Sequence, residues 1–108
     1  MVAINDIKNT IVNANSLEYL KEIPDESIDL IVTSPPYDNL RDYDGKTPWN
    51  YQIFKGIADQ IHRVLKKGGV CVWVVGDKVE NGKKTLTSFR HALYFDEIGM
   101  GTFDVIIY

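Results

Sequence analysis

Apolar and polar positions alternate along the chain in blocks that predict strands separated by amphipathic helices. Apolar, largely β-branched runs occupy 27–33, 70–75 and 102–108, and a shorter run occupies 9–12. Continuous apolar runs of this length are typical of strands that are covered on both faces. The segments between them carry helical spacing, so the sequence predicts the order β-α-β-α-β-α-β.

Two of the three predicted helices carry recognisable start signals. The first is capped by Asn15, has Glu18 as the partner of a capping box, and runs to Ile23. The second begins with Thr47 as its cap and Pro48 as its first helical residue. Its apolar stripe is spaced by three and four residues and comprises Phe54, Ile57, Ala58, Ile61, Val64 and Leu65.

Glycines are predicted to end the later helices. The segment 66–69, Lys-Lys-Gly-Gly, offers cations and glycines to the C-terminus of the second helix. The third helix spans about 87–98 and is stopped by Gly99. The alternating order indicates an α/β fold with a mostly parallel sheet and flanking helices.

Length and composition restrict the class of protein. A chain of 108 residues can form one small domain with a core, but not two. No apolar run approaches the roughly 20 residues of a membrane span, and the N-terminus lacks the pattern of a signal peptide. The single cysteine, Cys71, excludes an internal disulfide and fits a reducing compartment. We therefore expect a cytoplasmic, single-domain protein without membrane contact.

The net charge of −3 argues against strong binding to nucleic acid by this chain alone, because phosphate neutralisation dominates such binding. Cationic side chains gather in one stretch only: Lys78, Lys83, Lys84 and Arg90. A solvated loop is the simpler interpretation of this stretch, and a phosphate contact is the alternative. If DNA is the substrate, most of the binding energy comes from elsewhere.

The segment Thr-Ser-Pro-Pro-Tyr, 33–37, closes the apolar strand 27–33. Two consecutive prolines fix two φ angles and remove two backbone donors, and Ser34, which precedes them, is biased towards extended geometry. In open α/β sheets, ligands bind beyond the carboxyl ends of strands. The prolines could simply end the strand, with Tyr37 covering the edge of the core. The buried strand before them and the long polar loop after them favour a functional site.

The stretch "DLIVTSPPY" resembles motif IV of the DNA amino-methyltransferases, which transfer a methyl group from S-adenosylmethionine to the exocyclic amine of cytosine or adenine. "RVLKKGG" with the following strand is similar to the helix end and fifth strand of class I methyltransferases. "IVNANSLEYLKEIPDESIDLIVTSPPY" is similar to the N-terminal opening of the β-class members. The resemblance implies a partial Rossmann-like, class I methyltransferase fold and DNA as the partner.

The resemblance also implies roles for the residues of the motif. The Ser34 hydroxyl and the Pro35 carbonyl would accept the hydrogens of the base amine, Pro36 would hold the turn rigid, and Tyr37 would stack on the extruded base. Polar residues of the next loop would line the base or DNA side, although solvation is their default role: Asp38, Asn39, Arg41 and Tyr43. No metal is expected, because no ligand spacing links His62, His91 and Cys71.

Asn15 lies where the family hydrogen-bonds the adenine of the cofactor. The family more often has an acidic residue after a glycine at this point, whereas this chain has Ala14 before Asn15. Capping a helix is the alternative role, and the two are compatible. The glycine-rich loop that provides the main cofactor contact does not occur in the chain. Because the β class has a permuted motif order, residues 1–108 would form one incomplete catalytic domain whose C-terminal half, or a second chain, supplies that loop.

Without that half, apolar strand edges would be open, so we expect the isolated chain to be unstable, rearranged or oligomeric, and inactive alone. Three functions remain open. The first is the catalytic part of a DNA amino-methyltransferase, for which Ser34 leans towards cytosine. The second is a protein or RNA amine methyltransferase, which would carry the glycine loop upstream. The third is a non-catalytic α/β interaction module.

Overall fold

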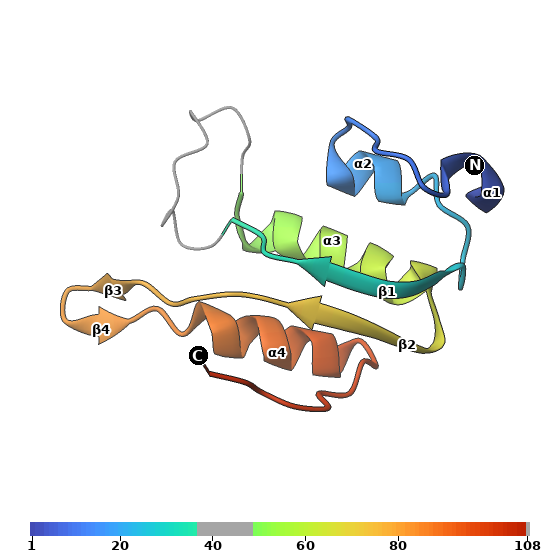
Figure 1. Cartoon of the computed structure of the whole chain (residues 1–108). Coiled ribbons are helices and arrows are strands. Elements are labelled where there is room, and N and C mark those ends of the chain that lie inside the picture. The colour runs from blue at the N-terminus through green and yellow to red at the C-terminus, as the bar shows by residue number, and fades with distance from the viewer. Residues whose placement is uncertain (37–48, 108) are drawn as a thin grey trace.

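The computed structural model describes residues 1–36 and 49–107. The chain forms a small α/β structure whose elements do not follow the predicted strict alternation, because two helices come first and three strands follow the third helix (Figure 1). In chain order the elements are α1 (Ile4–Ile7), α2 (Ser16–Leu20), β1 (Ile28–Thr33), α3 (Tyr51–Val64), β2 (Leu65–Trp73), β3 (Val79–Glu80), β4 (Lys83–Lys84) and α4 (Thr87–Glu97).

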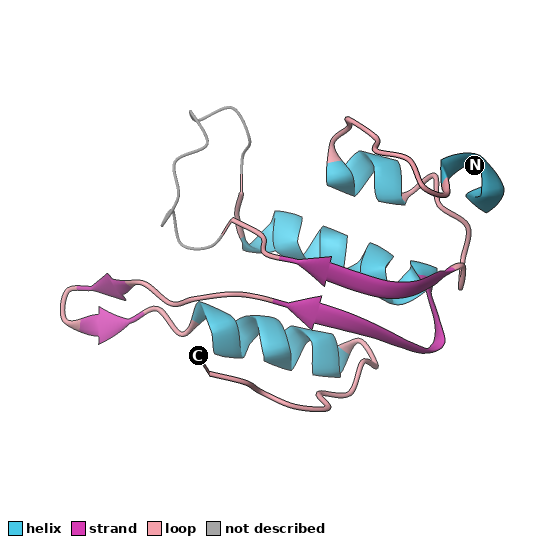
Figure 2. Ribbon diagram, in the orientation of Figure 1, coloured by secondary structure: helices cyan, strands magenta, loops and turns pink. Residues whose placement is uncertain are grey.

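The centre of the structure is a parallel pair of strands. β1 and β2 run side by side in the same direction, with α3 as the crossover between them (Figure 2). Leu30 lies opposite Val70, and Thr33 lies opposite Trp73. The predicted parallel pairing is therefore confirmed for these two strands.

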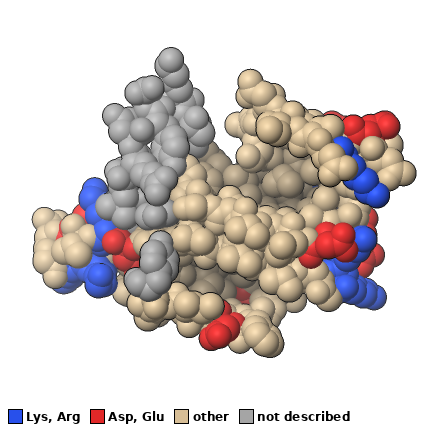
Figure 3. Space-filling model, viewed as in Figure 1, with Lys and Arg blue, Asp and Glu red and all other residues tan. Residues whose placement is uncertain are grey.

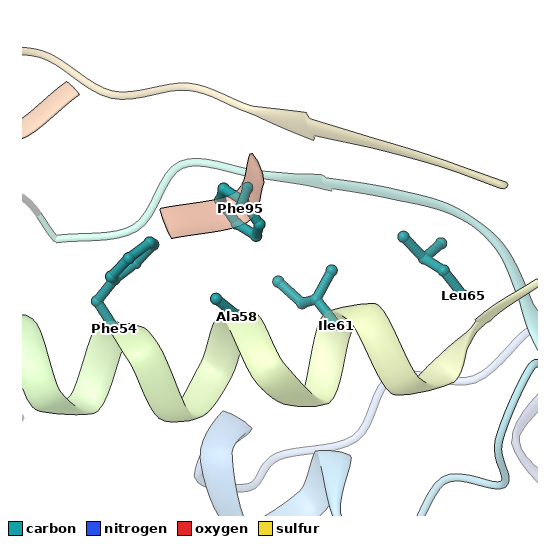
Figure 4. Packing of buried hydrophobic residues seen from close by; sticks show 5 residues of the cluster. All are labelled: Phe54, Ala58, Ile61, Leu65 and Phe95. Atoms are coloured by element: carbon teal, nitrogen blue, oxygen red, sulfur yellow. The ribbon is translucent and has the colours of Figure 1, made fainter. Parts of the chain in front are cut away.

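Helix α3 supplies most of the core. Phe54, Ala58 and Ile61 are buried and point from the helix towards the strands (Figure 4). They pack with Leu65 of β2 and Phe95 of α4. The predicted apolar stripe of this helix is confirmed, and Ile57 within it is half-buried.

The start of α3 differs from the prediction. The Asn50 side chain accepts a hydrogen bond from the backbone N–H of Ile53 (2.9 Å), so Asn50 is the cap and Tyr51 the first helical residue. Asn50 is a favourable cap because its amide oxygen accepts a hydrogen bond from a backbone donor of the first turn. Thr47 and Pro48, which were expected in these roles, lie outside the described residues.

An aromatic group joins α4 to the rest of the core. The rings of Phe54 and His91 stack, with their centroids 3.7 Å apart. The indole N–H of Trp73 donates to Nδ1 of His91 (3.1 Å). His91 is almost fully buried, so its ring satisfies the polar end of Trp73 inside the core.

The segment 66–69 was predicted to end the second helix with its two glycines. Instead, Gly68 and Gly69 lie within β2 and distort this strand. Helix α3 already ends at Val64, and these residues belong to β2. Ile28 lies opposite Leu65 while Leu30 lies opposite Val70, so β2 bulges between these pairs. A Cβ atom on Gly69 would lie 2.8 Å from the backbone oxygen of Lys66 and 3.1 Å from that of Asp29. The bulge is therefore closed around a residue that lacks a side chain.

Two predicted strands are not formed. Residues 9–12 are irregular, and residues 102–107 follow α4 as an exposed segment without strand pairing. A strand forms only where a neighbouring strand completes its backbone hydrogen bonds. Neither segment has such a neighbour among the described residues, although both have the apolar composition of a strand. The exposed apolar side chains of the second segment are Phe103, Val105, Ile106 and Ile107.

The expectation that the central strands are covered on both faces is also wrong. Ile31, Cys71 and Trp73 pack against the core built by α3 and α4. The opposite face is open to solvent, and its apolar side chains have exposed fractions of 57% for Leu30, 65% for Val32, 54% for Val70 and 44% for Val72. We call these four residues the open sheet face. No helix of the described ranges is long and apolar enough to cross a membrane.

Replacing Gly69 by alanine is expected to lower the free energy of unfolding by about 1–3 kcal/mol, because the new methyl group must displace backbone oxygens. Gly101→Ala is the matched control, since a Cβ atom there meets open space. Urea unfolding at one fixed protein concentration measures both variants. Equal midpoints for the two variants would show that the bulge is not closed around Gly69.

Candidate active site

The predicted site includes the double-proline segment Ser34-Pro35-Pro36, which we call the corner. It lies directly beyond the carboxyl end of β1. The Thr33 carbonyl accepts a hydrogen bond from the Val74 N–H (2.9 Å), which extends the strand ladder to the last residue before the corner. Pro35 is buried, Pro36 is half-buried, and Ser34 is exposed. The corner is thus anchored by a proline ring and presents its serine to solvent.

Part of the predicted site lies outside the described residues. This applies to the expected stacking residue and to the polar loop after it: Tyr37, Asp38, Asn39, Arg41 and Tyr43. The described part of the predicted site consists of Ser34, Pro35, Pro36 and Asn15.

Asn15 caps α2, as predicted. Its side-chain oxygen accepts a hydrogen bond from the backbone N–H of Glu18 (3.2 Å). The helix ends at Leu20, before the predicted Ile23, which is buried in the turn that follows. The cap uses only the oxygen of the Asn15 amide. The side chain is exposed, and its amide nitrogen makes no hydrogen bond to any residue that the structure describes.

A groove of about 270 Å³ connects the surroundings of Asn15 with those of Ser34. Ala14 and Ser16, on either side of Asn15, line it together with Thr33, which precedes Ser34. The surface is hollowed next to the segment that carries α1 and α2 (Figure 3). The complete lining is Val12, Ala14, Ser16, Tyr19, Leu20, Ile31, Thr33, Ile57 and Ile61.

The lining suits one part of a nucleoside-like ligand. Most of the lining residues are aliphatic, and Ser16, Tyr19 and Thr33 are those that carry a hydroxyl group. A flat heterocycle fits such a wall, because its faces are apolar and its edges form hydrogen bonds. Small-molecule pockets usually measure about 300–1000 Å³, so these residues would enclose a fragment of a cofactor and not all of it. Sequence reasoning missed Ser16, Tyr19 and Thr33, because the groove is assembled from separate elements and no contiguous motif links these residues.

Cys71 and His91, two further residues of types that act as nucleophiles or metal ligands, belong to the core and not to this site. Burial raises the pKa of the Cys71 thiol to about 11, so the side chain is a neutral, small hydrophobe at physiological pH, as predicted. His91 is enclosed by the aromatic core. Within residues 1–36 and 49–107, no three His, Cys, Asp or Glu side chains converge on a possible metal position.

Comparison with known proteins identifies relatives of the chain. It is 51% identical over 88 residues to the orphan methyltransferase M.BamHII of Bacillus amyloliquefaciens, covering 82% of this chain and 32% of that protein. It is 35% identical over 99 residues to the type II methyltransferase M.BglII of Bacillus subtilis, covering 85% and 26%. It is 40% identical over 65 residues to the DNA adenine methyltransferase YhdJ of Escherichia coli, covering 56% and 22%.

The chain thus spans about a third or less of the length of these relatives, which are enzymes. The sequence model of the DNA methylase family matches residues 28–108, a range that begins with β1 and includes the corner, both central strands and α4. The chain therefore belongs to the DNA methylase family of N6/N4 methyltransferases.

Proposed function

We propose that the chain is the catalytic part of a DNA amino-methyltransferase, and that residues 1–108 form an incomplete, Rossmann-like domain. Its reaction would transfer a methyl group from S-adenosylmethionine to the exocyclic amine of an extruded cytosine (N4) or adenine (N6). The observation that carries the proposal is the exposed Ser34 on an anchored double-proline corner at the carboxyl end of β1. Membership in the DNA methylase family supports the proposal, because the reaction requires fixed hydrogen-bond acceptors for the amine of the base.

The chemistry assigns each residue of the corner a task. The lone pair of a base amine is delocalised into the ring, which makes the nitrogen a weak nucleophile. The Ser34 hydroxyl oxygen and the Pro35 carbonyl oxygen accept its two hydrogens and thereby favour a pyramidal nitrogen with a directed lone pair. Pro35 and Pro36 hold these acceptors in place before the base arrives. Tyr37 provides the aromatic face on which the extruded base stacks.

The groove beside the corner would receive part of the cofactor. S-adenosylmethionine, when bound, supplies the activated methyl group as a sulfonium. Ala14, Ser16 and Thr33 line the wall, and the amide nitrogen of Asn15, whose oxygen caps α2, would donate to a ring nitrogen of the adenine. The main cofactor contact belongs to a part of the enzyme outside this sequence.

The same incomplete domain requires a partner. The four apolar residues of the open sheet face are 44–65% exposed, and among the described strands β1 and β2 pair only with each other. The remaining part of the enzyme, in the same polypeptide or a second one, would cover this surface, and a second copy would cover it when that part is missing. A non-catalytic interaction module is the second candidate function, and the open sheet face is the observation that favours it.

The residue that precedes the prolines bears on the choice between the two bases and leaves both open. A serine in this position leans towards cytosine, whereas one relative, YhdJ, is named a DNA adenine methyltransferase. Identification of the methylated nucleoside after enzymatic digestion of the product DNA would separate N4-methylcytosine from N6-methyladenine.

Ser34→Ala is expected to reduce methyl transfer about a hundredfold, because one acceptor for the amine is lost at the reacting centre. The assay mixes the chain with the remaining two thirds of M.BamHII and measures transfer of labelled methyl groups onto DNA. Thr102→Ala, which removes an exposed hydroxyl beyond α4, is the control and should keep full activity.

Full activity of Ser34→Ala would remove the corner from the mechanism. If the wild-type chain forms the complex but no mixture transfers methyl groups, the interaction module is favoured instead.

The isolated chain is expected to self-associate. Val32→Lys/Val72→Lys should shift it towards monomer, because the two residues lie opposite each other on the open sheet face. Val105→Lys changes an exposed valine outside the sheet and is the matched control. Sedimentation velocity over a concentration series measures all three proteins. A monodisperse wild-type monomer would contradict the proposed open assembly surface.

A further inference from the structure

The cationic stretch of the sequence is folded into a β-hairpin. β3 and β4 pair antiparallel, with Val79 opposite Lys84 and Glu80 opposite Lys83. Asn81 and Gly82 form the connecting turn with φ angles of 52° and 76°. Two consecutive positive φ angles at Asn-Gly are the geometry of a type I′ turn, which matches the twist of the strands. The hairpin therefore has a defined conformation and is more than a solvated loop.

The base of the hairpin is attached to the domain. The Thr85 N–H donates to the Lys78 carbonyl (2.9 Å), and the Lys78 N–H donates to the Thr85 hydroxyl (3.2 Å). Asp77, which precedes the hairpin, accepts hydrogen bonds from both the N–H and the hydroxyl of Ser88 in α4 (2.7 and 2.8 Å). These contacts hold the hairpin between the end of β2 and the start of α4.

The charges of the hairpin are directed to solvent. Lys83 and Lys84 are exposed and form no ion pair within the described residues, whereas Lys78 is paired with Glu80 (3.0 Å). Arg90 on α4 is also exposed. Figure 3 shows lysine and arginine side chains, with acidic ones among them, at the end of the molecule that carries β3 and β4, and further cations at the opposite end. Because the chain as a whole is acidic, this cationic surface is a local feature.

The hairpin and the corner lie at the same edge of the sheet. The hairpin follows the carboxyl end of β2, and Ser34 follows the carboxyl end of β1 (Figure 1). The two strands are parallel neighbours in register up to Thr33 and Trp73, so both ends face the same way. A duplex whose base reaches Ser34 would therefore present its backbone near the hairpin.

We propose that Lys83 and Lys84, together with Arg90, bind backbone phosphates of the DNA duplex next to the extruded base. This inference rests on the proposed function, because it assumes DNA at the corner. Phosphate contacts of this kind position a duplex without reading its sequence. They also compensate locally for the acidic charge of the rest of the chain.

The test compares two pairs of adjacent lysines at opposite ends of β2, and Lys66 of the second pair also forms an ion pair with Asp29 (3.1 Å). Lys83→Gln/Lys84→Gln removes the pair on the hairpin, and Lys66→Gln/Lys67→Gln removes the pair in the bulge at the other end of β2. Both variants lose the same charge. Fluorescence anisotropy with a labelled 20-base-pair duplex, over a series of salt concentrations, measures the affinity of the full chain and its variants.

The hairpin variant is expected to bind at least tenfold more weakly at low salt. Its slope of log K against log salt should decrease by about 1.8, which corresponds to two phosphates at about 0.9 each. The bulge variant should stay within twofold of the wild type. Equal losses in both variants, or no binding by the wild type at low salt, would overturn the proposal.

Methyl transfer by the hairpin variant, measured in the reconstituted enzyme, separates this proposal from the proposed function. Hairpin-dependent binding without methyl transfer in the reconstituted enzyme would overturn the catalytic proposal alone. Methyl transfer with hairpin-independent binding would overturn the hairpin proposal alone.

Discussion

The parallel pairing of β1 with β2 is the constraint on which the rest of the structure depends. It brings the chain after Thr33 and the chain after Trp73 to one edge of the sheet, although they are far apart in the sequence. The buried face of the pair packs against α3 and α4, and the Phe54–His91–Trp73 group fixes α4 to both. The bulge closed around Gly69 adjusts the register of this pair. The corner, the groove and the cationic hairpin all take their positions from it.

The sequence predicted those features that depend on local chemistry. The apolar stripe of α3, the Asn15 cap and the double-proline corner follow from side chains within a few residues of one another. The sequence-based prediction failed where an element depends on a distant partner. The strands that carry Val32 and Val72 have the apolar composition of strands covered on both faces, yet no described helix packs on the face that these two side chains form. The segment 102–107 is apolar but has no strand beside it, so its composition alone could not make it a strand.

The candidate site also has one part that depends on local sequence and one part that depends on distant residues. The Ser-Pro-Pro motif is contiguous and could be found by inspection, whereas the groove is assembled from α2, β1 and α3 and has no linear signal. Asn15 belongs to both groups, since its oxygen caps α2 and its amide nitrogen is the group that we propose for cofactor binding. The hairpin has a local signal, Asn81-Gly82, which is typical of a type I′ turn. This turn gives the lysines beside it a fixed position on the surface.

The central claim is that the corner after β1 holds the amine of an extruded base. The most direct measurement is a crystal structure of the chain, joined to the remaining part of the enzyme, with duplex DNA and a non-transferable analogue of S-adenosylmethionine. The account predicts the exocyclic nitrogen at about 3 Å from both the Ser34 hydroxyl oxygen and the Pro35 carbonyl oxygen. A base bound elsewhere, with these two oxygens bonded to other groups of the protein, would contradict it.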